Sequence, residues 1–310
     1  MVEQFGPTGM DGAADAPLHV RMRGHPQVFW NSAPLDIPRR QARALLYRLA
    51  AYLAPVPRAD LCYLFWPDQP EAIAHRDLSH LLTHLRHAFP APDILVSSSE
   101  TVGLNPQRVW ADTWALEEAL AGTRPATLRR AVALYRGPFL ASFSLAREPE
   151  VDVWIAEEQP AWERRYLEAV RALMLLEGEA GHASAAIALG ERYLATDDLA
   201  EDIHRHLITL YAARGERAMA QRQFERCAAA LQRELGLPPL PETVAAYEAA
   251  LAGTGHRPAA PPQDGLPCGA EIPFPQAGVK EPSPALLAAV VETRHGASLP
   301  RTERGNSAGG

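Results

Sequence analysis

The chain of 310 residues contains only three cysteines, and this scarcity excludes two kinds of site. Cys62, Cys227 and Cys268 are odd in number, lie far apart and form no Cys-x-x-Cys pair. A disulfide framework needs an even set of cysteines, and a cysteine zinc site needs closely paired thiolates. The sequence therefore predicts neither.

Long apolar runs are also missing. No stretch approaches the roughly 18 residues that a membrane-spanning helix needs. The N-terminus, MVEQFGPTGMDGAADAP, has neither the basic start nor the apolar stretch of a signal peptide. We therefore expect a cytoplasmic protein without a membrane partner, and we expect its first seventeen residues to be disordered.

No catalytic signature is present. The sequence has no Gly-x-Ser-x-Gly, no Walker loop, no Gly-x-Gly-x-x-Gly and no paired cysteine and histidine signature. We therefore expect no enzymatic activity and no cofactor.

Positive charge is confined to one part of an otherwise acidic chain, whose formal charge is −7. Residues 18–110 hold ten Arg against seven Asp plus Glu, together with six of the eleven His. The segments before and after this part are net acidic. Contacts with a negatively charged partner are therefore expected within 18–110.

The pattern of residues 18–110 predicts a winged helix. Two short strands, LHVRMRG and QVFW, precede a helix, RRQARALLYRLAAYL, whose apolar stripe includes Leu53. A short helix, RADLCYLFW, follows, and the D-x-x-E spacing of Asp68 and Glu71 predicts a capped third helix from about Gln69. DILVS and TVGLN then flank SSSE as a hairpin. In a winged helix of this order, the third helix lies in the DNA major groove.

The third helix is amphipathic. At about 100° per residue, its predicted buried face holds Ala74, Leu78, Leu81, Leu82, Leu85, Ala88 and Phe89. The opposite face holds Arg76, Ser79, His80, Thr83 and His87. His75 and Arg86 lie on one flank, and Asp77 and His84 lie on the other.

Three interpretations of this polar face are open. A metal pair is one, because His80 and His84 have i, i+4 spacing, although Leu81 stands where a zinc protease has its glutamate and no third ligand is near in the sequence. A merely solvated surface is the second. DNA contact is the third, because Arg76 can form two hydrogen bonds to guanine, and the hydroxyls and imidazoles can contact bases or phosphates.

The predicted DNA contacts include two residues outside the third helix. Arg40 and Arg43 stand near the start of the first helix, where a positive charge opposes the helix dipole. Phosphate contact is one reason for that placement, and a solvated helix start is the other. The full set is Arg40, Arg43, Arg76, Ser79, His80, Thr83, Arg86 and His87.

Residues 112–251 are rich in Ala and Leu and predict an all-α domain with an internal repeat. Gly181 and Gly215 lie 34 residues apart, which is the tetratricopeptide period. GHASAA and GERAMA align across it, so that Ala186 matches Ala220. Two degenerate repeats are predicted, and such stacked helix pairs leave a concave face for a partner.

Five stretches, taken as a set, resemble a known family. PLDIPRRQARALLYRLA, VPRADLCYLFWPDQPEAIAHRDLSHLLTHLRHAF, VGLNPQRVWADTWALEEAL, ALYRGPFLASFS and AQRQFERCAAALQRELGLPPLPETVAAYEAAL occur in this order. The chain in this respect resembles bacterial transcription activators of the antibiotic-regulatory-protein type. The resemblance implies an OmpR-like winged helix joined to a bacterial transcriptional activator domain. It also implies binding to promoter double-stranded DNA, often as a homodimer on direct repeats, and recruitment of RNA polymerase.

The expected organisation is therefore mainly α, with short β-strands only in the winged helix. Residues 18–110 form the winged helix, 111–252 form the activator domain, and the Pro- and Gly-rich stretch 253–310 is expected to be a disordered tail. The third helix has histidines where the family usually has Arg, and the hairpin tip SSSE is not basic. The alternative function is therefore a protein–protein adaptor whose winged helix has lost DNA binding.

Overall fold

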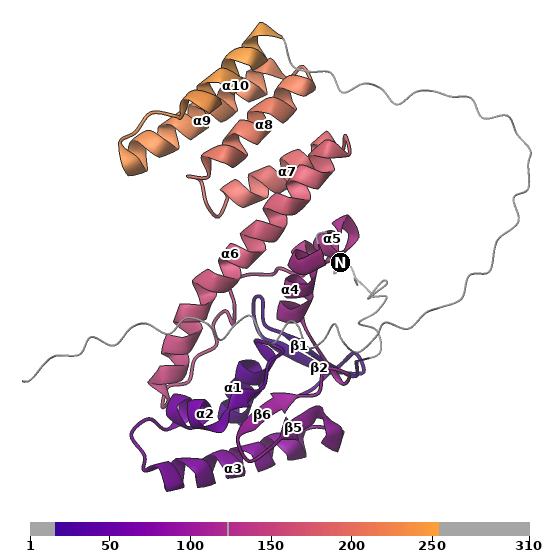
Figure 1. The fold of residues 1–310 in the computed structure, drawn as a ribbon, viewed down its shortest axis with the longest axis vertical. Helices are drawn as coiled ribbons and strands as arrows, with labels where there is room; N and C mark the ends of the chain where they lie inside the picture. The colour runs from indigo at the N-terminus through magenta and orange to yellow at the C-terminus, as the bar shows by residue number, and fades with distance from the viewer. Residues whose placement is uncertain (1–15, 123, 254–310) are drawn as a thin grey trace, which may run out of the picture. The chain divides into compact units, whose positions relative to one another are not determined.

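The structure is a computed structural model that describes residues 16–122 and 124–253 (Figure 1). All of these residues belong to one compact unit. The predicted disorder of the N-terminus up to residue 15, and of the tail from residue 254, lies outside the described residues. The described part is mainly helical, with strands only near its N-terminal end, as the sequence predicts.

Four strands form a sheet of order β3-β2-β1-β7. In the chain, the first three of these strands come before the helices of the winged helix, and the fourth comes after them. β1 (Leu18–Arg21) and β2 (Gln27–Trp30) are antiparallel, and β3 (Ala33–Pro34) extends the sheet beyond β2. β7 (Val109–Ala111) pairs parallel to β1. The last strand before the helical region therefore returns to the first strand of the chain.

The winged helix has the predicted order. α1 (Arg40–Ala50), α2 (Arg58–Phe65) and α3 (Glu71–Ala88) pack together (Figure 1). A turn of 3-10 helix, η1 (Pro92–Ile94), leads to the hairpin of β5 (Leu95–Ser97) and β6 (Thr101–Leu104). β4 (Val56–Pro57) pairs with the other edge of β6, which brings the start of α2 beside the hairpin.

The predicted start of the third helix is wrong by two residues. The helix begins at Glu71 rather than near Gln69, and Pro70 is its N-cap without a side-chain hydrogen bond. Asp68 is therefore not the capping residue. Proline suits the start of a helix because it has no backbone N–H to leave unpaired and its φ is already near the helical value.

Burial confirms the apolar face of α3. Six of the predicted residues are buried, namely Ala74, Leu78, Leu81, Leu82, Leu85 and Phe89. The seventh, Ala88, is partly buried. The stripe predicted for the first helix is also buried, except at its end. Leu53 is 57% exposed because α1 ends at Ala50 and no longer directs this side chain toward the core.

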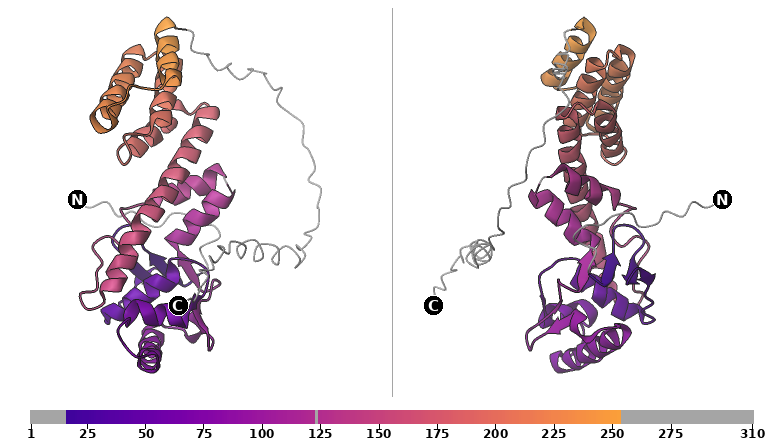
Figure 2. Two further views of the ribbon diagram at one scale, coloured as in Figure 1. Left: turned by 60° about the vertical axis from the view of Figure 1, so that its left-hand side comes forward. Right: turned by 90° about the vertical axis from the view of Figure 1, so that its right-hand side faces the viewer.

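Seven helices make up the rest of the described chain (Figure 2). They are α4 (Asp112–Gly122), α5 (Pro125–Ala133), α6 (Pro149–Glu179), α7 (Ala183–Leu194), α8 (Glu201–Ala213), α9 (Arg217–Leu235) and α10 (Pro241–Ala252). α6 packs against α4, α5 and α7, while α10 packs against α8 and α9.

The predicted repeat is confirmed by the hairpins α6–α7 and α8–α9. Gly181 and Gly215 occupy the two turns with φ of 79° and 75°, a left-handed conformation that favours glycine. The residue after each glycine donates its N–H to the carbonyl five residues earlier, at 2.9 Å in both hairpins. The matched Ala186 and Ala220 are both fully buried.

Two positions of the first hairpin differ from their matches 34 residues later: Gly190 stands opposite Phe224, and Glu177 stands opposite Tyr211. A Cβ on Gly190 would lie 2.7 Å from a methyl carbon of Leu207, so only glycine allows this approach of α7 to α8. Glu177 is buried at the end of α6, where it accepts hydrogen bonds from Arg129 and His182.

One hydrophobic core joins the winged helix to the start of the helical region. It runs continuously from Leu18 in β1 to Leu173 in α6. A second cluster packs the remaining repeat helices, from Met174 to Ala250. The winged helix therefore shares its buried surface with α4, α5 and most of α6.

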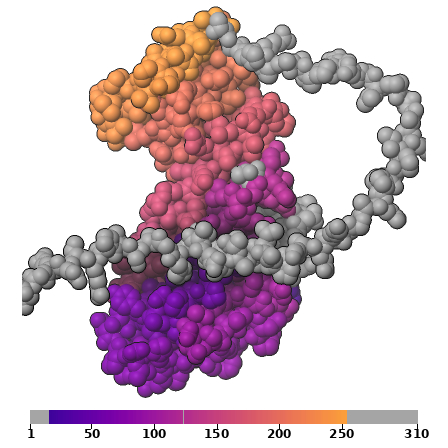
Figure 3. Space-filling view, viewed as in Figure 1, coloured from indigo at the N-terminus to yellow at the C-terminus, as the bar shows by residue number. Residues whose placement is uncertain are grey.

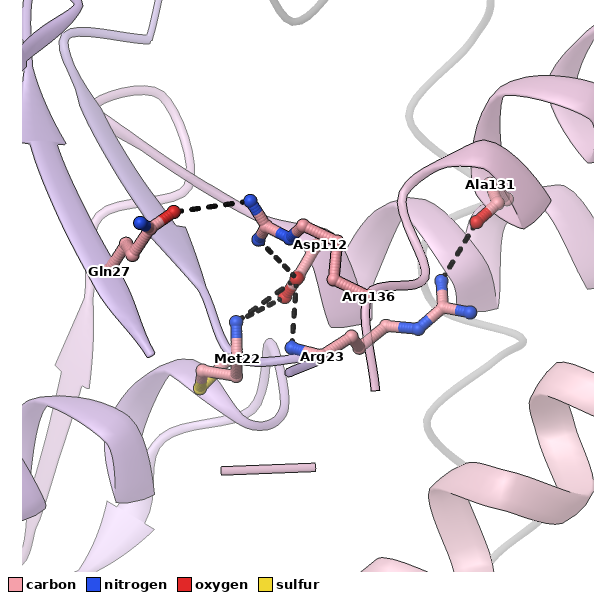
Figure 4. A network of polar contacts seen from close by, with 6 residues as sticks. All are labelled: Met22, Arg23, Gln27, Asp112, Ala131 and Arg136. Atoms are coloured by element: carbon pink, nitrogen blue, oxygen red, sulfur yellow. Dashed lines mark hydrogen bonds and ion pairs between the residues drawn. The ribbon is translucent and has the colours of Figure 1, made fainter. Parts of the chain in front are cut away.

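Asp112, the first residue of α4, joins the sheet to this helical region (Figure 4). The side chain is fully buried, and its carboxylate accepts the backbone N–H groups of Met22 at 2.8 Å and Arg23 at 3.0 Å. The Arg136 guanidinium lies 3.9 Å away. Burial raises the pKa of the Asp112 carboxyl, and the two backbone hydrogen bonds partly oppose this effect.

We expect Asp112→Ala to lower the free energy of unfolding by about 2–4 kcal/mol, because two buried N–H groups lose their acceptor. Urea unfolding of the full chain measures the change. Glu118→Ala, on an exposed position of the same helix, is the matched control and should change it by less than about 0.5 kcal/mol. Equal effects of the two substitutions would contradict this role of Asp112.

Candidate nucleic-acid interface

α3 presents its predicted polar face to solvent. Five predicted DNA-contacting residues are exposed on it: Arg76, Ser79, His80, Thr83 and His87. The helix packs against α1 and α2 through its opposite face. In the space-filling view its outer side lies along the lower edge of the described residues (Figure 3). The exposed face of this 18-residue helix is therefore available to a partner.

The two hydroxyls of this face are bonded to the helix itself. Ser79 Oγ donates to the carbonyl of His75, and Thr83 Oγ1 donates to the carbonyl of Ser79, both at 2.9 Å. A hydroxyl has one proton and two acceptor lone pairs. In this rotamer the two hydroxyl oxygens can therefore accept hydrogen bonds. The amino groups of adenine and cytosine in the major groove are suitable donors for them.

Arg76 has an acidic neighbour on the same helix. Its Nε lies 3.2 Å from Asp77 Oδ1, and the Arg76 side chain is 63% exposed. An exposed ion pair of this kind stabilises by less than about 1 kcal/mol. The guanidinium can therefore exchange this partner for another acceptor at low cost.

Two arginines lie against the hairpin, and one of them is absent from the predicted set. Arg86 Nη2 donates to Ser97 Oγ at 2.6 Å. Arg58 Nε donates to the Ser98 carbonyl at 3.0 Å, and the Arg58 backbone N–H donates to the Glu100 carbonyl at 2.8 Å. Arg58 is brought there by the pairing of β4 with β6, which no local sequence pattern reveals.

The Ser98 hydroxyl is hydrogen-bonded within the hairpin tip. Ser98 Oγ accepts the backbone N–H groups of Glu100 at 3.1 Å and Thr101 at 3.0 Å. The tip is therefore a compact polar turn without a basic residue. Positive charge reaches it from the side instead, through the arginines of α2 and α3.

Arg40 and Arg43 lie on α1. Arg40 Nε donates to the Ser144 carbonyl at 2.6 Å, and its guanidinium lies 5.1 Å from the centre of the Phe143 ring. Arg43 is half-buried beside Tyr47, whose pKa burial raises to about 12. Both arginines thus contact other residues of the protein itself, and their contact with DNA phosphates remains a prediction.

The histidines of α3 have no assembled metal site around them. Within residues 16–122 and 124–253, no group of three or more His, Cys, Asp or Glu could hold a metal ion. His75 lies 3.7 Å from Glu71 one turn earlier. No helix in the same ranges is long and apolar enough to cross a membrane.

Comparison with known proteins agrees with this arrangement. Residues 111–251 match the family model of the bacterial transcriptional activator domain. The structure of Mycobacterium tuberculosis EmbR in complex with low affinity phosphopeptide matches with a TM-score of 0.59 and 22% identity. The match covers 76% of this chain and 65% of that one, so the chain spans less than two thirds of the EmbR structure. No curated protein matches the chain.

The chain thus consists of a winged helix followed directly by a region that matches the bacterial transcriptional activator domain. This is the arrangement of activators of the antibiotic-regulatory-protein type, and the resemblance read from the sequence is confirmed.

Proposed function

We propose that the chain binds double-stranded DNA in a sequence-specific manner and activates transcription in the cytoplasm by recruiting RNA polymerase. The exposed polar face of α3, next to a wing bordered by two arginines, is the observation that supports it most strongly. The bacterial transcriptional activator domain supports the recruiting role. Neither step requires covalent chemistry by the protein.

The α3 residues divide into two roles under this proposal. Arg76 reads a base edge, with Ser79 and Thr83 as nearby acceptors. His80 and His87 contact bases or phosphates on the same face. Arg86, Arg58 and, from α1, Arg40 and Arg43 contact phosphates, which position the helix without reading sequence.

The helical repeat has a different task in the proposal. Its stacked hairpins α6–α7 and α8–α9 provide the surface for self-association into a homodimer and for contact with RNA polymerase. A dimer would double the number of phosphate contacts and compensate for a hairpin tip that has none of its own.

A mobility shift with the DNA upstream of the protein's own gene tests the proposal. With about three to five phosphate contacts per protomer, the slope of log affinity against log salt should be about −3 to −4.5. No shift at low salt, or an association independent of salt, would favour the protein–protein adaptor instead.

Separate substitutions of two arginines should distinguish base recognition from phosphate contact. Arg76→Ala should lose about 1–3 kcal/mol of discrimination at one base pair. Arg58→Ala should weaken binding to all sequences alike and make the salt slope shallower by about one. Binding to a set of single-base operator variants measures both effects, and identical profiles for the two variants would refute the division of roles.

DNA binding should also take up protons. Imidazole titrates around neutral pH, and a nearby phosphate favours its charged form. Affinity should therefore rise as the pH falls from about 7.5 to about 6. The double substitution His80→Gln with His87→Gln should remove this dependence, while His206→Gln, an exposed position on α8, should keep it. A parent protein without a pH slope would show that α3 has only a solvated histidine face.

A further inference from the structure

An open pocket of about 310 Å³ lies between the β2–β3 hairpin and α1. Its apolar wall comes from the hairpin and from the segment that leads into α1: Pro26, Val28, Phe29, Pro34, Leu35 and Ile37. α1 adds two polar side chains to the wall, Arg43 and Tyr47. The proposed DNA contacts use Arg43 but none of the other residues of this wall.

The apolar wall is held in place by the rest of the winged helix. β2 pairs with β1 along its whole length, and the Leu35 N–H donates to the Val28 carbonyl at 2.9 Å. Ile37 is 2% exposed and fixes the segment before α1 to the main core. The pocket is therefore already formed in the free protein.

Arg43 brings hydrogen-bond donors without acceptors to this pocket. The residue is half-buried, and its Nε is buried without a hydrogen-bond partner. Nη1 and Nη2 are not buried, and no hydrogen bond or ion pair joins them to another residue of the described ranges. A guanidinium is charged at all ordinary pH values. The end of the Arg43 side chain is therefore open to an anion.

Tyr47 brings a second free donor. Its ring is buried and meets the Phe143 ring edge-on at 5.1 Å, so that only 3% of the residue is exposed. The hydroxyl is not among the buried unpaired atoms, and it bonds to no residue in the described part of the chain. Burial raises the pKa of Tyr47 to about 12, so the hydroxyl keeps its proton at neutral pH and can donate it.

The two donors lie close together. Arg43 and Tyr47 are four residues apart on α1 and therefore share one face of the helix. The Arg43 charge is near enough to the hydroxyl to oppose the rise in the pKa of Tyr47. Asp36 also lines the pocket, but it is exposed to solvent, which screens its charge. An anion between Arg43 and Tyr47 would thus accept from both and would lie beside the apolar wall.

We propose that this pocket binds a small carboxylic acid with an apolar body. The carboxylate accepts hydrogen bonds from the Arg43 guanidinium and the Tyr47 hydroxyl, and the apolar body covers the wall formed by the hairpin. Apolar walls with a few convergent polar groups are typical of small-ligand sites. The bound acid occupies the guanidinium that the proposed function assigns to a DNA phosphate, so it acts against DNA binding.

An NMR titration of the full chain with hexanoate tests the proposal without DNA, so its failure is distinct from a failure of the proposed function. We expect saturable binding with a Kd of about 1 mM or lower, which is ordinary for a ligand of this size. Hexanamide has the apolar body without the charge, and acetate has the charge without the body. Each should bind at least about tenfold more weakly.

Inorganic phosphate stands in for the competing occupant, a DNA backbone phosphate, and should also bind at least about tenfold more weakly than hexanoate. If hexanoate does not bind, the proposal is wrong. It is equally wrong if phosphate binds as tightly as hexanoate, because Arg43 would then serve only as a phosphate contact.

Substitutions of the two donors locate the binding. Tyr47→Phe removes only the hydroxyl and should raise the Kd for hexanoate about tenfold, since one hydrogen bond to a charged group is lost. Tyr63→Phe, at an exposed position of α2 outside the pocket, is the matched control and should leave the Kd unchanged. Arg43→Gln should raise the Kd at least about tenfold and remove the preference for hexanoate over hexanamide.

A third substitution tests the apolar wall. Pro34→Trp fills the pocket from an exposed position of the edge strand β3 and should abolish binding, while Pro90→Trp, exposed and outside the pocket, should retain it. Tyr47→Phe keeps the packing of the ring, so its result decides if another variant fails to fold. Unchanged hexanoate binding by Tyr47→Phe, or by Pro34→Trp, would overturn the proposal.

Discussion

The carboxylate of Asp112 holds together the two parts of the chain whose combination gives it a function. It accepts backbone N–H groups at the end of β1, while it begins the first helix of the activator domain. Nearby, Thr113 Oγ1 donates to the Ala50 carbonyl, and Tyr52 donates its hydroxyl to Glu158 of α6. These polar contacts surround a continuous apolar core, so the orientation of α3 depends on helices far along the chain.

This use of buried charge has a cost, because the Asp112 carboxylate and the Arg23 guanidinium are both withdrawn from water. The raised pKa of Asp112 expresses this cost, since the folded chain favours the neutral carboxyl relative to the unfolded chain. Stability from this group is therefore present below its ordinary pKa and decreases as the pH rises through the folded value.

The elements that carry regular patterns could be predicted from the sequence. The apolar spacing of α3 defined its buried face, and the period between Gly181 and Gly215 defined the helical repeat down to equivalent backbone hydrogen bonds. Contacts that depend on the pairing of strands far apart in the sequence could not be predicted. Arg58 reaches the wing only because β4 pairs with β6, and the buried role of Asp112 requires β7 to return to β1. The start of α3 was misplaced because a capping pattern was present in the sequence while proline occupied the cap.

The continuous core also bears on how far this chain can be divided into independent domains. Its apolar cluster does not end with the wing but extends to Leu173, near the C-terminal end of α6. A fragment cut after residue 110 would lose one face of its own interior, together with the acceptor for two backbone N–H groups. The shortest autonomous piece that contains α3 therefore extends well into the activator domain. In a chimeric protein, the junction between such parts would therefore have to lie at that boundary, rather than at the one that the sequence motifs suggest.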